Sequence, residues 1–559
     1  MTVDPVTLNI VGTALAAIPR EMAANLRRAA FSSVVREARD YAVALVDPRG
    51  NVVSQAEAIP IMTAGISHAI AAVLADTDPA TLTADDAILY NDPFHGGQHL
   101  QDIYLFTPIF HEGTLAGFAA SVAHHVDIGG GEPGLTINAK EIYQEGIRLP
   151  GRPFSVSRDW HGGFVEQLFR LNVRVPDLVV GDLNAQFAAN NVAAERLREL
   201  VARHGPELTT AVMDELQDYA ERRLRDSIAE IPDGDYAAEE IIDASTWGGD
   251  RHHVRVAVRV RGSDLEVDFT GTDPQVPANL NCPFASTVSS VQSAIRGLLR
   301  DKDIPFNEGC NRPITVSAPY GSILNPAAPA AVRARLTPAS RAFDAVIRAL
   351  AEALPERVVA TGYDTTSAAA LSYLDPDSHE YEVVLEVLGG GWGAGAAGDG
   401  ADALDNPISN CASAPVEALE IDYSHFRVTE FALIPGSGGD GRTRGGLGFV
   451  RTYEATRDGV TFSAYSDRHR YGARGLFGGD PGATGGLEVT RSDGTVQRLS
   501  HIDAVTLAAG ERVSLRTGGG GGYGPPTDRP AAHREADLRD GLTVEAGDRD
   551  GLTLKETPQ

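Results

Sequence analysis

The chain has 559 residues, 43% of them hydrophobic and 22% charged, which is ordinary for a globular protein and unlike a disordered or fibrous one. This length exceeds a single core, so several packed domains are expected. A formal net charge of -28 argues against nucleic acid or an anionic membrane as the main partner.

The three cysteines are widely spaced and form no CxxC pair, which argues against a disulfide scaffold and against a thiolate zinc site. The N-terminal apolar segment is not preceded by a basic leader, and no apolar run approaches the roughly 18 residues of a membrane span. We therefore expect a cytoplasmic protein.

Hydrophobic periodicity predicts the elements of the N-terminal half in chain order. Apolar residues at helical spacing predict a helix over 5–29, and a hairpin follows at 41–54. The next expected elements are a helix at 62–76, strands at 87–90, 103–110 and 115–122, a long loop or cover at 128–152, and helices within 163–230 interrupted around 174–182.

In the second half of the chain, the hydrophobic pattern first predicts both helices and strands and then mainly strands. Strands are expected within 235–272, helices at 283–300 and 338–353, and strands with glycine-rich turns from about 380 to 515, before a polar, irregular or draped end. The predicted fold class is a mixed α/β multidomain protein: an α/β N-terminal half with a metal-site hairpin, and a β-rich C-terminal part. The expected parts are an N-terminal α/β metal-binding part (1–235), a central α/β part (236–380), a β-rich part (381–525) and a polar tail (526–559).

Histidine is unusually dense in one hairpin. Five of the 15 histidines fall between positions 95 and 125, mostly in the segments NDPFHGGQHLQD and SVAHHVDIGGGEPG. Both segments also carry aspartate, and the predicted hairpin brings 99–103 close to 122–127. Imidazole and carboxylate ligands without thiolate are typical of a catalytic metal such as zinc, manganese or iron, which can activate water for attack on a carbonyl.

A structural interpretation of the same residues stays open. Asp92 and Pro93 suit a plain turn that His95 caps, and His111 lies at the hairpin turn, where a surface position is expected. In a strand, one member of the pair His124 and His125 must point away from any shared site.

The glycine-rich segments at 389–395, 436–446 and 517–526 match neither a phosphate loop nor a dinucleotide fingerprint. We expect them to form tight turns of a β-rich region. The chain also has no HExxH and no GxSxG motif, so neither a zincin nor a serine hydrolase is supported.

Longer motifs resemble the hydantoinase B / 5-oxoprolinase family. NDPFHGGQHLQD is similar to its NDPYxGGTHLPD segment, and HHVDIGGGEPG is similar to HHADVGGxxPGS. Further similar segments run in order along nearly the whole chain, including RRAAFSSVVREARDYAVALVDPRGNVVSQ, EIYQEGIRLP, NVRVPDLVVGDLNAQ, VDFTGT, IPFNEGCNRPI and GGGGGYGPP.

This resemblance implies a two-component, ATP-dependent enzyme that opens hydantoins, 5-oxoproline or related lactams. The chain would carry a divalent metal (zinc or manganese), and ATP with Mg²⁺ would bind a separate hydantoinase A-type subunit in a hetero-oligomer. The absence of a phosphate loop in this sequence agrees with that division.

The resemblance also suggests roles for individual residues. Asp40, His99, Asp102 and His124 would bind the metal, while Glu37, His125 and Asp127 would serve in acid–base chemistry or support the ligands. The sequence departs from the family pattern at Gln98, where threonine is usual, at Gln101, where proline is usual, and at Met62, where a histidine is common. A ligand at position 62 would be absent here.

Two other functions stay open at this point. One is a component of an acetone or acetophenone carboxylase, whose chains resemble these but tend to be longer. The other is a scaffold without catalytic activity that stabilises an ATPase partner, against which the His/Asp cluster argues.

Overall fold

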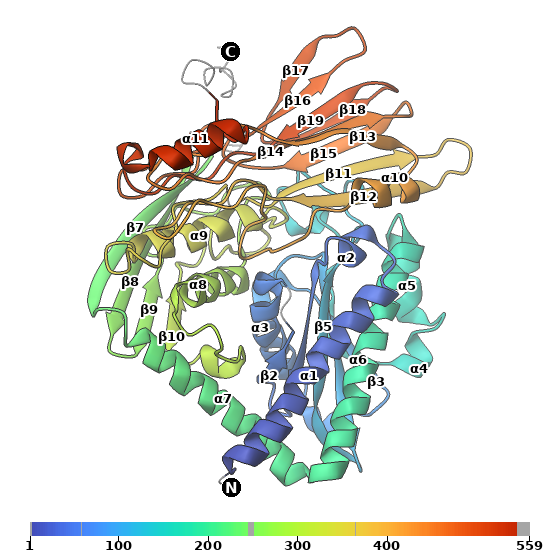
Figure 1. Cartoon of the computed structure of the whole chain (residues 1–559). Coiled ribbons are helices and arrows are strands. Elements are labelled where there is room, and N and C mark those ends of the chain that lie inside the picture. Colours follow the sequence, from blue (N-terminus) through green and yellow to red (C-terminus); the bar gives the residue numbers. More distant parts are fainter. Residues whose placement is uncertain (1–2, 57–58, 244–250, 364, 545–559) are drawn as a thin grey trace.

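The computed structural model describes residues 3–56, 59–243, 251–363 and 365–544. These residues form a mixed α/β architecture with four sheets (Figure 1). Within the described residues, no helix has the length and apolar character needed to span a bilayer.

The N-terminal part is built on a six-stranded antiparallel sheet with strand order β2-β1-β5-β4-β3-β6. Its strands are β1 (Tyr41–Val46), β2 (Val52–Gln55), β3 (Asp86–Tyr90), β4 (Asp102–His111), β5 (Thr114–His124) and β6 (Pro150–Ser155). The expected hairpins at 41–54 and 103–122 are confirmed. The segment between β5 and β6 is largely irregular, as expected, apart from a short 3₁₀ turn at Ile142–Gln144.

Two long helices pack side by side against this sheet (Figure 1). Helix α1 (Pro5–Ala29) has the predicted bounds, begins where the Asp4 carboxylate accepts the N–H groups of Val6 and Thr7, and buries one stripe of apolar residues. Helix α6 (Pro176–His204) contacts both α1 and strands β4 and β5.

The other helices of this part are α2 (Ser33–Arg36), α3 (Pro60–Asp76), α4 (Val156–Asp159), α5 (Phe164–Asn172) and α7 (Pro206–Ile228). The interruption expected at 174–182 is shorter, because α6 already begins at Pro176. A second interruption, which the sequence pattern did not predict, lies at Gly205, where φ is 84°.

A second sheet has the order β10-β9-β8-β7 and carries α8 and α9 on its inner side (Figure 1). Its elements are β7 (Gly234–Asp243), β8 (Arg251–Arg261), β9 (Asp264–Asp268), β10 (Ile314–Ser317), α8 (Phe284–Leu298) and α9 (Leu336–Ala349). Residues 244–250 of the predicted strand region lie outside the described residues.

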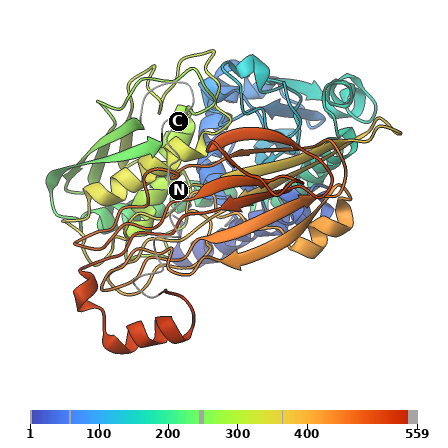
Figure 2. The same ribbon diagram turned by 90° about the horizontal axis from the view of Figure 1, so that it is seen from above.

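The C-terminal part is β-rich, as predicted (Figure 2). It forms two sheets that share a separate apolar core. One has the order β12-β11-β15-β18: β11 (Ser367–Leu374), β12 (Tyr381–Leu388), β15 (Val460–Tyr465) and β18 (Ile502–Leu507). The other has the order β13-β14-β19-β16-β17: β13 (Phe426–Leu433), β14 (Phe449–Ala455), β16 (Gly486–Thr490), β17 (Val496–Leu499) and β19 (Arg512–Arg516).

Two helices in this part were not expected from the sequence. They are α10 (Val416–Asp422) and α11 (Ala531–Arg539). The expectation of an irregular end is therefore wrong for 531–539, while 545–559 lie outside the described residues.

Apart from a turn that reaches Gly436 (φ 74°), the glycine-rich segments do not form the expected tight turns. They run alongside one another as irregular extended chains, joined by bonds such as Gly391 N–H to Gly518 O (3.0 Å) and Gly446 N–H to Trp392 O (2.8 Å). A Cβ on Gly520 would lie 1.9 Å from the carbonyl oxygen of Trp392. These glycines therefore allow backbone to pack on backbone, which any side chain would prevent.

We expect Gly520→Ala to destabilise the C-terminal part by more than about 4 kcal/mol, because the added methyl overlaps a backbone oxygen that cannot move alone. Gly297→Ala is the control: Gly297 lies in α8 with open space around its Cβ position. Alanine there should be neutral or stabilise by about 0.5–1 kcal/mol. Thermal unfolding and soluble yield test the pair, and equal behaviour of the two variants would contradict the packing role.

Candidate metal centre

The register of β4 and β5 brings the predicted site together. Asp102 at the start of β4 pairs directly with His124 at the end of β5. Residues opposite each other in antiparallel strands point to the same face, so the two side chains meet. His99 precedes β4 by three residues, and its backbone carbonyl accepts the Asp102 N–H at 3.1 Å. The centroid of its ring lies 4.8 Å from that of the His124 ring.

His99, Asp102 and His124 offer three metal-ligand atoms within 4.8 Å of one another. His99 Nδ1 lies 2.9 Å from Asp102 Oδ2, and His124 Nδ1 lies 3.5 Å from Asp102 Oδ1. All three side chains are buried, with Asp102 0% exposed. We call these three residues the donor group.

The donor group has the chemistry of a cation site. Two of its buried atoms, His99 Nδ1 and Asp102 Oδ1, complete no hydrogen bond of good geometry. Burial lowers the pKa of His124 to about 4 and that of His99 well below its usual value, so both imidazoles are neutral. Burial opposes the charge of Asp102, but the Arg335 guanidinium holds its pKa well below the usual range. Neutral imidazoles and a carboxylate suit zinc or manganese.

Asp40 lies beside the donor group. Its carbonyl accepts the His124 N–H at 3.0 Å, and its Oδ2 lies 3.7 Å from His124 Nδ1. Burial and the nearby charge of Asp102 raise the pKa of Asp40 to about 8. Asp40 therefore lies next to the donor group without being one of its three ligand atoms, and its predicted role as a fourth ligand stays a prediction.

The other predicted residues face elsewhere. His125 points to the opposite side of the sheet, where its Nε2 lies 3.0 Å from Gln186 Oε1 of α6. Asp127 accepts hydrogen bonds from the backbone N–H groups of Gly129 and Arg174. Glu37 pairs with its neighbour Arg36 at 2.8 Å. The structure therefore does not bring Glu37, His125 or Asp127 into the donor group, and gives each a local structural contact.

Two buried arginines that we did not single out from the sequence approach the donor group from the segment before α9. Arg335 Nη2 donates to Asp102 Oδ2 at 2.5 Å and to Gln98 Oε1 at 3.1 Å. Arg333 Nη1 lies 3.4 Å from His124 Nε2, and its Nη2 donates to Gly134 O. The one available signal was a pair of arginines inside the apolar run APAAVRARL.

Glu145 holds this arginine segment in place. Its buried carboxylate accepts the backbone N–H groups of Val332 and Arg333 at 2.8–3.0 Å. Glu145 lies in the EIYQEGIRLP motif, far from the arginines in sequence.

Glu145 is expected to make stability depend on pH. Burial raises its pKa from 4.5 to about 7, so between these values the folded chain binds this proton more tightly than the unfolded chain. The free energy of unfolding therefore falls as pH rises through this window. Glu145→Gln, which does not titrate, should lose less stability than the wild type between pH 5 and 8. Thermal midpoints at four pH values measure this, and parallel curves would contradict it.

A small cavity opens beside the donor group. It is lined by Asp40, His99, His124 and Arg335, by the hydroxyl-bearing Thr366, Ser409 and Tyr465, and by seven apolar residues: Ile59, Ile61, Met62, Leu336, Ala368, Leu385 and Val387. Met62, where the family pattern commonly has histidine, is one of the apolar lining residues. A substrate in this cavity would lie against the donor group.

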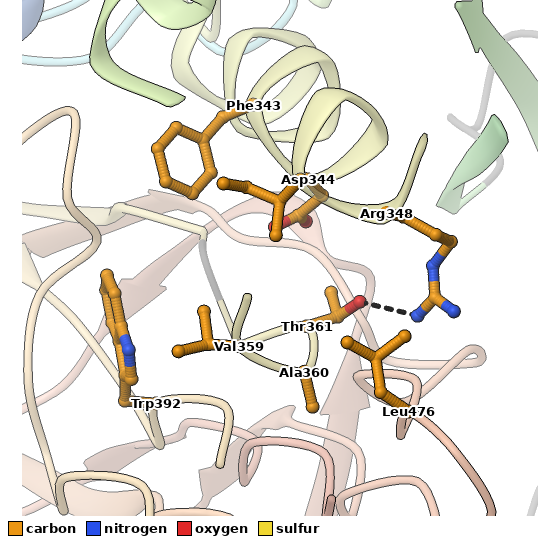
Figure 3. Close-up of a pocket in the computed structure, with 9 residues that line it drawn as sticks. Phe343, Asp344, Arg348, Val359, Ala360, Thr361, Trp392 and Leu476 are labelled. Atoms are coloured by element: carbon orange, nitrogen blue, oxygen red, sulfur yellow. Dashed lines mark hydrogen bonds between the residues drawn. The ribbon is translucent and has the colours of Figure 1, made fainter. Parts of the chain in front are cut away.

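A second cavity lies at the end of α9 (Figure 3). Its Arg348 donates to Thr361 Oγ1 and to Glu240 Oε1, both at 2.9 Å. Its Asp344 pairs with Arg341 and Arg468. The charged groups at this cavity are engaged with protein partners, so we place the candidate site at the first cavity.

Comparison with known proteins identifies the family of this chain. A family model described as hydantoinase B/oxoprolinase matches residues 4–526. The chain is 32% identical to the B subunit of a putative D-/L-hydantoinase of Pseudomonas sp. (strain NS671), over 97% of this chain and 93% of that protein. It is 33% identical to the beta subunit of the caprolactamase of Pseudomonas jessenii, over 98% of this chain and 95% of that protein. It spans 40% of the 5-oxoprolinase of Dictyostelium discoideum, at 28% identity.

Solved structures share the fold. The ATP-dependent caprolactamase of Pseudomonas jessenii matches with a TM-score of 0.90 and 31% identity, over 100% of this chain and 98% of that one. An acetone carboxylase chain matches with a TM-score of 0.88 at 19% identity, over 98% of this chain and 79% of that one. With the family model and these full-length relatives, the chain belongs to the hydantoinase B/oxoprolinase family.

Proposed function

We propose that this chain is the metal-containing B-type subunit of an ATP-dependent cyclic-amide hydrolase, and that it works with an ATP-binding A-type subunit. The observation that carries the proposal is the buried donor group beside a cavity of this chain. Relatives over nearly the full length, named as the B subunit of a putative D-/L-hydantoinase and the beta subunit of a caprolactamase, point to the same reaction class.

The donor group and Asp40 would hold a divalent metal such as zinc or manganese. When bound, the metal would polarise a carbonyl and lower the pKa of water. Arg335 keeps Asp102 ionised and oriented, as a supporting contact does for a ligand. Burial raises the pKa of Tyr465, so its hydroxyl stays protonated at neutral pH and can donate a hydrogen bond to a ring in the cavity.

ATP and Mg²⁺ would bind the partner subunit. An amide carbonyl is a weak electrophile, and phosphorylation of its oxygen would turn that oxygen into a leaving group. The glycine-rich segments of this chain are packed against backbone, which supports a nucleotide site elsewhere.

Co-expression with an A-type chain tests the proposal. The purified complex should hydrolyse ATP only when a hydantoin, 5-oxoproline or another lactam is present, and should release the ring-opened product. Bicarbonate-dependent ATP use with a ketone would instead favour a carboxylase. Full activity of a metal-free complex would favour a scaffold role.

A further inference from the structure

The cavity beside the donor group lies between two sheets. The donor group lies at the edge of the six-stranded sheet where β4 begins and β5 ends, while another wall comes from the four-stranded sheet of the C-terminal part. In that wall, Ala368 of β11 pairs directly with Val387 of β12 on one side and with Tyr465 of β15 on the other. Directly opposed residues share a face, and all three line the cavity. We call this row the platform.

The surroundings of the platform are apolar. Leu385 lies two residues before Val387 on β12 and so shares its face. Ile61 and Met62 at the start of α3 and Leu336 at the start of α9 line other parts of the cavity. A molecule in this cavity would contact apolar side chains on these surfaces. It would contact polar atoms only at the donor end and at the hydroxyls of Thr366, Ser409 and Tyr465.

The formal charges of the cavity are confined to its donor end. Among the described lining residues, Arg335 is the one cation, and it is bound to Asp102 at 2.5 Å. Asp40 adds an acid at the same end. The side chains of the platform and of Leu385, Met62 and Leu336 are uncharged. The buried Arg333 lies near Tyr465 but is not a lining residue, and its guanidinium contacts His124 Nε2 and donates to Gly134 O.

We propose that this site takes cyclic amides with an uncharged, largely hydrocarbon body, and discriminates against rings that carry a carboxylate on the carbon next to the nitrogen, as 5-oxoproline does. This inference rests on the proposed function. With the amide carbonyl at the donor group, such a carboxylate points away from it, toward the apolar wall. A carboxylate buried there would lose its hydration and could gain at most an uncharged hydroxyl, such as that of Tyr465, in return.

A matched set of three substrates tests this. In whichever ring size the ATP assay finds active, we compare the unsubstituted lactam, the ring with the carboxylate next to nitrogen, and the carboxamide of that acid, which has nearly the same size and no charge. The expected kcat/KM of the carboxylate is at least about 100-fold below that of the carboxamide. Calorimetric titration of the holo-complex without ATP should show the same preference in binding.

The possible outcomes separate the two proposals. If no cyclic amide stimulates ATP hydrolysis or binds, the proposed function fails. If the carboxylate is bound and turned over as well as its carboxamide, the discrimination proposed here is overturned while the function stands.

Met62 provides a second test, because lysine has a similarly long, unbranched side chain. In Met62→Lys the new ammonium group can pair with the carboxylate, so the ratio of kcat/KM for the carboxamide to that for the carboxylate should fall at least about tenfold. The control Met62→Leu should leave this ratio unchanged. Metal content is measured in both variants because Met62 lines the same cavity as the donor group. An equal change of this ratio in both variants would overturn the proposal. If Met62→Lys does not fold, the comparison of the three substrates on the wild-type protein decides alone.

Discussion

His124→Ala and Asp102→Ala are each expected to purify without stoichiometric metal and to lose more than about 100-fold in turnover. Each removes one of three buried ligand atoms that lie within 4.8 Å of one another, and even residues that only support ligands typically change metal affinity by about 10–100-fold. Elemental analysis of the purified chain measures the loss directly, without an activity assay.

Two other histidines of the same motifs serve as controls. His95 belongs to the first motif, but its side chain is 74% exposed, so His95→Ala should keep its metal. His125→Gln should also keep it, because that ring faces Gln186 of α6 and not the donor group. Full metal occupancy in the His124 and Asp102 variants would overturn the site assignment.

Arg335→Met is expected to destabilise the metal-free protein by about 3–5 kcal/mol, the usual effect of breaking a buried ion pair from one side. Arg335 and Asp102 are 2% and 0% exposed, so the carboxylate would be left buried without its partner. A bound divalent cation supplies the missing positive charge, so the loss should shrink when metal is present. Thermal midpoints in chelator and in saturating manganese or zinc measure the difference.

The control for this experiment is Arg259→Met. Arg259 pairs with Glu266 at 2.5 Å on the surface, where such pairs contribute about 0–1 kcal/mol. Its midpoint should change little and equally in both conditions. An equal loss for Arg335→Met with and without metal would mean that Asp102 is not a ligand.

Much of the donor group could be predicted from local sequence. The segments HLQD and HHVD border two strands of similar length around the turn at 111–113, so a hairpin brings them together. Strand alternation also requires that His124 and His125 face opposite sides. Which of the two faces Asp102 depends on register, because a one-residue slip would exchange them. The structure pairs Asp102 with His124.

Other parts of the site have no local signature. Arg335 reaches Asp102 from 233 residues away, and Glu145 holds the arginine segment from 187 residues away. The glycine-rich segments also show how little local composition predicts. Their composition suggested turns, but in the structure they pack against one another as extended chains.

The sequence by itself determined the donor types, the hairpin that joins them and the β-rich C-terminal part, because periodicity and turn residues act over short distances. Only the tertiary structure decided that His124 and not His125 completes the donor group. It also decided that Arg335 balances Asp102 and that the row Tyr465, Ala368 and Val387 forms a wall of the cavity. These contacts arise when separate sheets pack together, and no local pattern encodes which faces will meet.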